Sequence, residues 1–234
     1  MQKDRSTRSE RLFEELCNAH GVAFQRLPER QKDKQPDYEL TLSGQRVVVE
    51  VKQVEPNEED EEYHKKIEAG VIFVQHRNPD LMAKRVRNLI STSRDQFASY
   101  LERHPSTPSM LVVFDAAENW YTDPYAILVA LYGWEQATFS VPNDGRSPYI
   151  TDVGPGKRNN RELRADKNTH LSALATLHER CELVAPHNRF LELSIYHNRF
   201  AQLALDASLW KSDYIRHQEL AEKIQGQFQS WVEI

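Results

Sequence analysis

Apolar residues near the start of the chain recur at helical spacing. They fall on one face of a helix that we expect over residues 6–20, and Gly21 follows as a stop signal. Proline suits the first turn of a helix, so Pro79 and Pro124 mark two more, over about 79–104 and 123–131. The apolar positions of the first helix are Leu12, Phe13, Leu16 and Cys17.

Shorter runs of apolar and β-branched residues, bounded by turn residues, predict strands. The acidic segment 55–69 is expected as a loop or exposed helix, 141–169 as a long irregular stretch, and 213–231 as a helix. This order predicts an α/β protein with a mixed sheet flanked by helices. The expected strands cover 22–24, 38–42, 46–53, 71–75, 110–115, 171–177 and 190–196.

The chain of 234 residues has room for one large domain or two small ones. We expect a core over 1–132 and a C-terminal α+β extension over 133–234. The later strands have little helix of their own to cover them, so the extension is expected to pack onto the same sheet.

The composition limits the cellular compartment and the relation to membranes that we expect for the protein. No run of 18 apolar residues occurs, and the N-terminus has no apolar segment typical of a signal peptide. Of the two cysteines, Cys17 falls on the apolar helix face and is expected in the core rather than in a disulfide. These points favour a cytoplasmic protein that does not enter a membrane.

The formal net charge of −5 argues against a protein that coats nucleic acid by bulk charge. Charge is unevenly spread, however, so a local basic groove is still possible, and gripping a phosphate backbone takes only a few well-placed cations. One basic segment, 157–167, contains Lys157, Arg158, Arg161, Arg164 and Lys167.

The most informative segment is the hairpin expected over 36–53. If Ser43 and Gly44 form a two-residue turn, Asp37 lies opposite Glu50 on the neighbouring strand. Two like charges in such a pair repel unless a cation sits between them, and a divalent metal is the simplest candidate. Lys52 points to the same face as Glu50. Two carboxylates and one ammonium are the groups that a phosphodiester hydrolase needs.

The same segment resembles the PD-(D/E)xK nucleases, the restriction-endonuclease-like superfamily. Pro36-Asp37 matches the first half of their motif and Glu50-Val51-Lys52 the second, and the likeness covers roughly residues 8–115. It implies Mg²⁺ or Mn²⁺ bound by Asp37, Glu50 and the carbonyl of Val51, with Lys52 at the attacking water. It also implies cleavage of nucleic acid that leaves a 5′-phosphate, with DNA favoured over RNA as the substrate.

Many members of this superfamily use a further glutamate from the helix before the hairpin. Glu10, Glu14 and Glu15 are available here. Glu10 lies at the edge of the apolar face, so we expect it in the site, with Glu14 in reserve. The alternative is that all three are solvated helix charges.

Substrate contacts are expected from the helix over 79–104 and from the basic loop. Gln96 through Tyr100 is similar to the Gln-apolar-x-x-Tyr motif of the recombination-exonuclease branch of the superfamily, and Arg85 shares an edge of the helix with Gln96. The basic loop offers Lys157, Arg158 and Arg161 for phosphates. For all of these arginines and lysines, an incidental solvated charge is the competing interpretation.

The sequence therefore predicts a Mg²⁺- or Mn²⁺-dependent endonuclease. The resemblance also allows a homodimer, because many such nucleases cut both strands as dimers. The main rival is a non-catalytic nucleic-acid-binding or interaction module on the same fold. A weaker rival is a different hydrolase with a site around Asp115 and His197.

Overall fold

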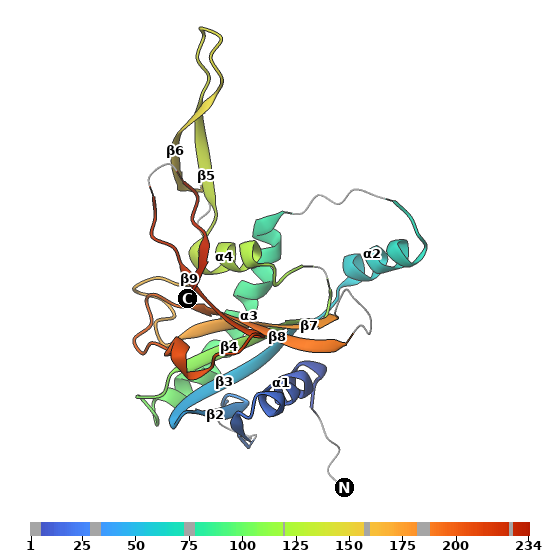
Figure 1. Cartoon of the computed structure of the whole chain (residues 1–234), viewed down its shortest axis with the longest axis vertical. Helices are drawn as coiled ribbons and strands as arrows, with labels where there is room; N and C mark the ends of the chain where they lie inside the picture. Colours follow the sequence, from blue (N-terminus) through green and yellow to red (C-terminus); the bar gives the residue numbers. More distant parts are fainter. Residues whose placement is uncertain are drawn as a thin grey trace.

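The computed structural model describes residues 6–28, 34–72, 78–118, 120–156, 160–181, 188–224 and 227–234. Eight strands form one mixed sheet in the order β1-β2-β3-β4-β7-β8-β9-β10, and helices cover both of its faces (Figure 1). The expected α/β class with a large mixed sheet is thus confirmed.

In the half of the sheet formed by β1 to β4, the order of the strands in the sheet is also their order along the chain. β1 to β3 are antiparallel neighbours, and β3, β4 and β7 are parallel to one another. The strands of the main sheet are β1 (Ala23–Arg26), β2 (Tyr38–Leu42), β3 (Gln45–Val54), β4 (Ser109–Asp115), β7 (Ala173–Cys181), β8 (Arg189–His197), β9 (Ile215–Leu220) and β10 (Trp231–Glu233).

One face of the sheet is covered by α1 (Arg8–Ala19). Its N-terminus has a capping box, in which Thr7 accepts a hydrogen bond from the backbone of Glu10 while the Glu10 side chain accepts one from the backbone of Thr7. The apolar face predicted from the sequence packs into this core, and Cys17 is fully buried as a free thiol, as expected.

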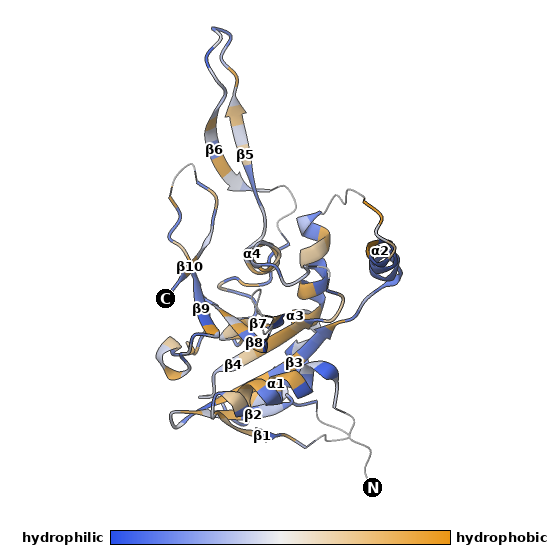
Figure 2. Ribbon diagram, turned by 45° about the vertical axis from the view of Figure 1, so that its right-hand side comes forward, coloured by the Kyte–Doolittle hydropathy of each residue, from blue (hydrophilic) through white to orange (hydrophobic). Residues whose placement is uncertain are grey.

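The opposite face is covered by α3 (Pro79–Leu101) and α4 (Pro124–Tyr132). Both helices begin with proline in the first turn, as the sequence predicted. Every residue of α4 from Ala126 to Tyr132 is buried, so this helix is apolar all round. By contrast, α2 (Glu58–Glu68) is largely hydrophilic in Figure 2 and stands to one side.

Three expectations fail in the second half of the chain. Within the stretch expected to be irregular, β6 (Tyr149–Pro155) pairs with β5 (Glu135–Ser140), which lies just before it, and the two form a separate hairpin that projects from the body in Figure 1. The segment expected as a C-terminal helix contains strand β9, and β10 begins at its last residue. In the described residues after α4 the only helix is the short 3-10 turn η1 (Ala207–Leu209), so the extension is not α+β there.

The physical reason for the C-terminal error is that pairing overrides local propensity. β9 has a composition compatible with helix, but Ile215 and His217 are buried at alternate positions while Arg216 between them is exposed. Parallel pairing with β8 fixes this period of two.

Val71 and Ile72 are not in a strand, and the rest of the strand expected over 71–75 lies outside the described residues. None of the described helices has the length and apolar character needed to cross a bilayer.

Candidate active site

A tight turn sets the register of the β2–β3 hairpin. Ser43 and Gly44 have φ angles of 47° and 87°, the left-handed values that a two-residue hairpin turn requires. Tyr38 pairs with Val49, which places Asp37, the residue before β2, beside Glu50. The register predicted from the sequence is therefore confirmed.

Asp37 is fixed by the backbone of the opposite strand. Its Oδ2 accepts a hydrogen bond from the Val51 amide at 2.8 Å. The amide and carbonyl of a strand residue point to the same edge, so the Val51 carbonyl also faces the Asp37 side, beyond the end of β2. Burial raises the pKa of Asp37 above its ordinary value, against the lowering effects of the Val51 amide and of Lys52.

Glu50 is the most buried member of the group, with 1% of its surface exposed. Its Oε1 accepts from the Lys52 ammonium and, at 2.7 Å, from Nε2 of Gln96 on α3. Its Oε2 is buried and has no hydrogen-bond partner among the described residues. Burial first, and then the nearby charge of Asp37, raise the pKa of Glu50 to about 7 despite Lys52.

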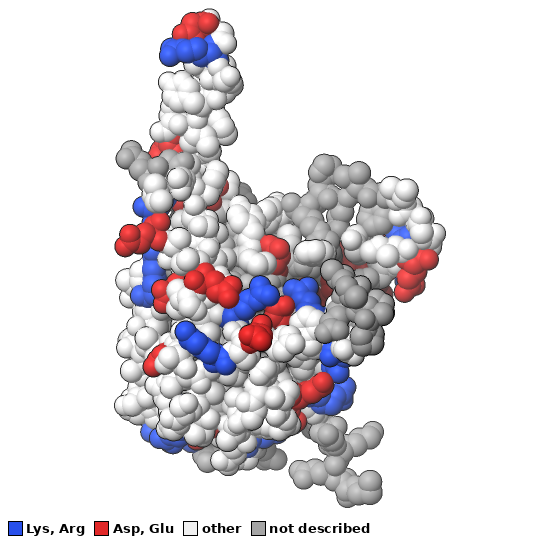
Figure 3. All heavy atoms as spheres, in the orientation of Figure 1, with Lys and Arg blue, Asp and Glu red and all other residues white. Residues whose placement is uncertain are grey.

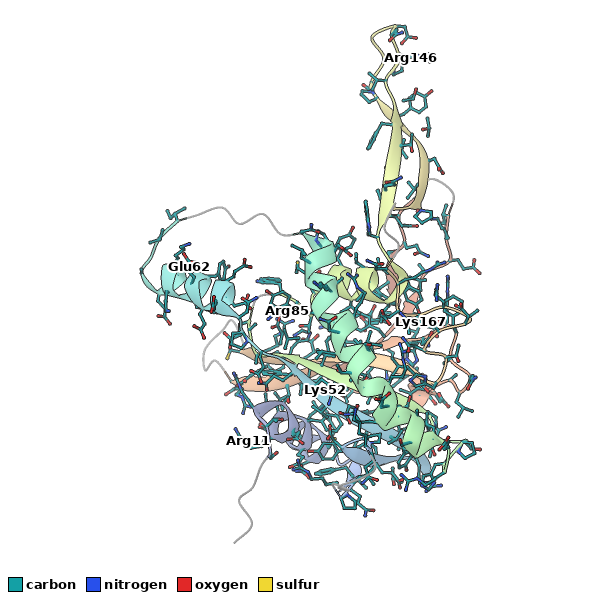
Figure 4. All side chains as sticks on the ribbon, turned by 180° about the vertical axis from the view of Figure 1, so that it is seen from behind. Arg11, Lys52, Glu62, Arg85, Arg146 and Lys167 are labelled. Carbon is teal, nitrogen blue, oxygen red and sulfur yellow. The ribbon has the colours of Figure 1, made fainter. Side chains whose placement is uncertain are left out.

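Lys52 is the partly exposed neighbour of the buried Glu50. It lies on the α3 side of the sheet, below the middle of that helix in Figure 4, and 27% of its side chain is exposed. The structure thus brings together Asp37, Glu50 and Lys52, as the sequence predicted.

The donor set can be tested against a divalent ion. The described residues contain no group of three or more His, Cys, Asp or Glu side chains that could hold a metal. A ligand set here would consist of Asp37, Glu50 and the Val51 carbonyl, all hard oxygen donors. The unpartnered Oε2 of Glu50 is a buried acceptor that a cation would satisfy. The residues present therefore fit Mg²⁺ or Mn²⁺, with water completing the coordination.

Glu10 lies close enough for its charge to contribute to raising the pKa of Asp37, but its oxygens have other partners. Oε1 accepts from Arg26 at 2.5 Å, and Oε2 accepts from the Thr7 amide at 2.5 Å. The reserve candidate, Glu14, accepts from the Tyr38 hydroxyl at 2.7 Å. Glu15 pairs with Arg189. The structure thus gives all three glutamates structural contacts, and a role for Glu10 in the site stays a prediction.

The two residues of the Gln-apolar-x-x-Tyr segment reach different carboxylates. Gln96 contacts Glu50 and so belongs to the site, whereas the Tyr100 hydroxyl donates to Glu39 on β2. Tyr100 is 3% exposed, whereas the Glu39 side chain that it contacts is 21% exposed. Of the pair, only Gln96 touches the predicted catalytic group.

Arg85 lies nearer the N-terminus of α3 than Gln96, about 16 Å away along the helix axis. It is on the side of α2 in Figure 4. Its guanidinium donates to Asp60 Oδ2 at 2.8 Å and to the Glu55 carbonyl at 2.9 Å, and it stacks on the Tyr121 ring. Asp60 is fully buried, so this arginine neutralises a buried charge. Its predicted contact with substrate stays a prediction.

The predicted basic loop is only partly described. Lys157 and Arg158 lie outside the described residues, and Arg161 is exposed beside the end of α4, where the Glu162 amide donates to the Ala130 carbonyl. No described contact joins Arg161 to Glu50. Figure 3 shows acidic and basic side chains interspersed on the face that it draws, rather than one broad basic area.

The fold places Asp115 and His197, the residues of the alternative hydrolase site, far apart. Asp115 ends β4, whereas His197 pairs with Ala173 next to Met110, at the beginning of β4. Five residues of strand separate the two positions, about 17 Å. His197 instead contacts His217 at 2.9 Å inside the core.

The sequence reasoning missed a group of polar residues on β7, β8 and β9. Glu192 and Ser194 alternate with buried Leu191, Leu193 and Ile195, which is typical of a sheet face that no helix covers. That alternation was a readable signal. Arg216 was missed because its strand was expected as a helix.

Comparisons of the chain with protein-family models, with curated protein sequences and with solved structures gave no match. The interpretation of the site therefore rests on the residues and contacts described above.

Proposed function

We propose that the chain is a divalent-metal-dependent nuclease of the restriction-endonuclease-like type, which hydrolyses phosphodiester bonds of DNA in preference to RNA. The observation that carries this proposal is the convergence of the Asp37 and Glu50 carboxylates with the Lys52 ammonium, where Glu50 Oε2 is buried and receives no hydrogen bond from the described residues.

The chain's own groups divide the work. Asp37 and Glu50, with the Val51 carbonyl, would hold Mg²⁺ or Mn²⁺, which polarises the phosphate and lowers the pKa of a bound water. Lys52 orients the attacking water and offsets charge on the pentavalent phosphate. Gln96 holds Oε1 of Glu50 in place through its 2.7 Å hydrogen bond.

Burial on the α3 side keeps water away from Glu50, while the exposed fraction of Lys52 marks where a phosphate can enter. Because the pKa of Glu50 is raised to about 7, a substantial fraction of the free protein retains a proton there near neutral pH. Metal binding displaces this proton, so metal affinity rises with pH through about 7.

The test uses plasmid DNA, single-stranded DNA and RNA, each with and without Mg²⁺. We expect cleavage that requires the metal and falls at least a hundredfold in Lys52→Ala and Asp37→Ala. Lys84→Ala, which removes an exposed lysine of α3, is the matched control and keeps full activity.

Calorimetric titration with Mn²⁺ separates the proposal from its rival. A divalent-ion site that disappears in Asp37→Ala supports the nuclease. Nucleic-acid binding that is independent of metal and is lost at high salt, without any cutting, would instead identify a non-catalytic binding module.

A further inference from the structure

A cavity of about 710 Å³ opens on the same face of the sheet as Lys52, at the carboxyl ends of β4 and β7. This volume lies within the usual range of small-molecule sites. The residues that carry the argument are Trp120, His178, Arg180, Glu192, Tyr196 and Arg216. None of them belongs to the site described above.

Strand register places the cavity relative to that site. Lys52, Val113, Thr176, Ser194 and Arg216 are successive partners across β3, β4, β7, β8 and β9. Arg216 is therefore four strands from Lys52 in one row, about 19 Å away. Both side chains belong to the face that α3 and α4 cover only in part.

Two arginines flank one carboxylate in the cavity. Nε of Arg180 lies 3.6 Å from Glu192 Oε2, and Nε of Arg216 lies 3.4 Å from Glu192 Oε1. Both arginine side chains are 51% exposed, and no other ion pair of theirs occurs among the described residues. The paired terminal nitrogens of each guanidinium are thus left to bind an anion in two-point geometry.

The cavity is not simply an anion site, because several carboxylates also line it. Asp115 accepts from the Tyr121 amide and Asp123 from the Tyr125 amide, each at 2.8 Å. Glu179 is paired with Arg8, and Glu118 lies 3.9 Å from the same arginine. Acceptors and donors are interspersed, so the lining suits a ligand that has N–H donors as well as an anionic group.

An aromatic ring stands at the rim. Trp120 is 62% exposed and has a φ of 64°, a left-handed value that is strained for a bulky residue. An exposed indole that lines a polar cavity suits the stacking of a flat ring.

We propose that this cavity binds a nucleoside monophosphate unit, with the base stacked on Trp120, the phosphate held by Arg180 and Arg216, and carboxylate oxygens accepting from the base. The unit is either a free nucleotide or one residue of a nucleic-acid strand, since the recognised chemistry is the same. The site goes beyond the proposed cleavage and does not depend on it.

The experiment measures binding of AMP, CMP and inorganic phosphate by calorimetry in EDTA, with a short single-stranded oligonucleotide as a further arm. We expect the nucleotides to bind without metal, and affinity to fall at least tenfold in Arg216→Ala and in Trp120→Ala. Arg216→Lys keeps the charge but loses the paired guanidinium nitrogens that bind an anion at two points, so it should lose part of the affinity. The matched control is Arg146→Ala, an exposed arginine on the β5–β6 hairpin.

Tighter binding of the oligonucleotide than of AMP would assign the unit to a strand, and equal affinity would assign it to a free nucleotide. Inorganic phosphate binding as tightly as AMP, or nucleotide affinity unchanged in both cavity variants, would overturn the proposal. Asp37→Ala separates the two sites, because it abolishes cleavage and leaves nucleotide binding intact. Circular dichroism of each variant verifies folding, which half-exposed arginines are expected to leave unchanged.

Discussion

Gln96 of α3 donates a 2.7 Å hydrogen bond to Oε1 of Glu50 in β3, and so links a helix to the carboxylate pair at the start of the hairpin. Among the described residues the Gln96 amide nitrogen donates to Glu50, so we assign Gln96 a positioning role on Glu50. Partners of this kind fix the direction of metal-binding groups.

For Gln96→Ala we expect metal affinity and cleavage rate to fall by roughly 10- to 100-fold. Glu50 keeps its contact with Lys52 but loses its fixed direction. Mn²⁺ titration together with cleavage kinetics measures both effects. Asn88→Ala, an exposed amide two turns earlier on the same helix, serves as control. Unchanged Mn²⁺ affinity in Gln96→Ala would show that Glu50 does not need this hydrogen bond.

Glu50 makes the folded protein less stable as pH rises. Its pKa is raised from an ordinary 4.5 to about 7, so the folded state binds a proton that the unfolded chain releases between these values. Stability from this group is therefore highest below about pH 4.5 and is lost as pH approaches 7.

Glu50→Gln removes that penalty. We expect its free energy of unfolding to exceed that of the unsubstituted protein by about 1–3 kcal/mol at pH 8, with little difference at pH 4.5. Urea denaturation at the two pH values in EDTA measures it. A variant that gains or loses the same amount at both values would contradict the pKa argument. Cleavage should be lost, because Gln lacks the carboxylate proposed to hold the metal. The variant would then be more stable but inactive.

Glu10 can be assigned by two substitutions. Glu10→Gln keeps an acceptor for the Thr7 amide and so keeps the capping box, but it removes the charge. Glu10→Ala removes both and should cost about 1 kcal/mol of stability or more. If Glu10 acts only on α1 and Arg26, Glu10→Gln retains cleavage. A loss of cleavage in Glu10→Gln, with stability preserved, would place it among the catalytic groups.

Arg85 is expected to matter for stability more than for substrate binding. Arg85→Ala removes the guanidinium that neutralises the fully buried Asp60, at a cost of about 3 kcal/mol or more. Thermal denaturation measures this, with the adjacent exposed Lys84→Ala as control. A stable Arg85→Ala protein that binds DNA more weakly would instead support the role in substrate binding inferred from the sequence.

The hairpin was predictable because its information is local. Ser43-Gly44 specifies the turn, and the turn specifies which side chains face one another. The starts of α3 and α4 were likewise marked by Pro79 and Pro124. The contact between Gln96 and Glu50 depends on how α3 docks, which no local pattern reveals.

The C-terminal strands and the cavity also could not be predicted, because they too depend on tertiary contacts rather than on a local sequence pattern. Residues 215–220 have no strong strand signal, and it is pairing with β8 that makes them a strand. Arg216 acquires its neighbours Glu192 and Arg180 only after three strands have come together.

The sheet order has a consequence for how the protein folds. One edge of β3 pairs with β2 across a two-residue turn, whereas the other edge pairs with β4, with Val48 meeting Ser109 at 61 positions along the chain. Local pairing of this kind forms in about 1–10 μs, while closure of a distant parallel pair is far slower. The two carboxylates therefore meet early in refolding. The low-dielectric surroundings that make Glu50 take up a proton arrive only when α3 and β4 dock, so proton uptake near pH 6 reports the late step.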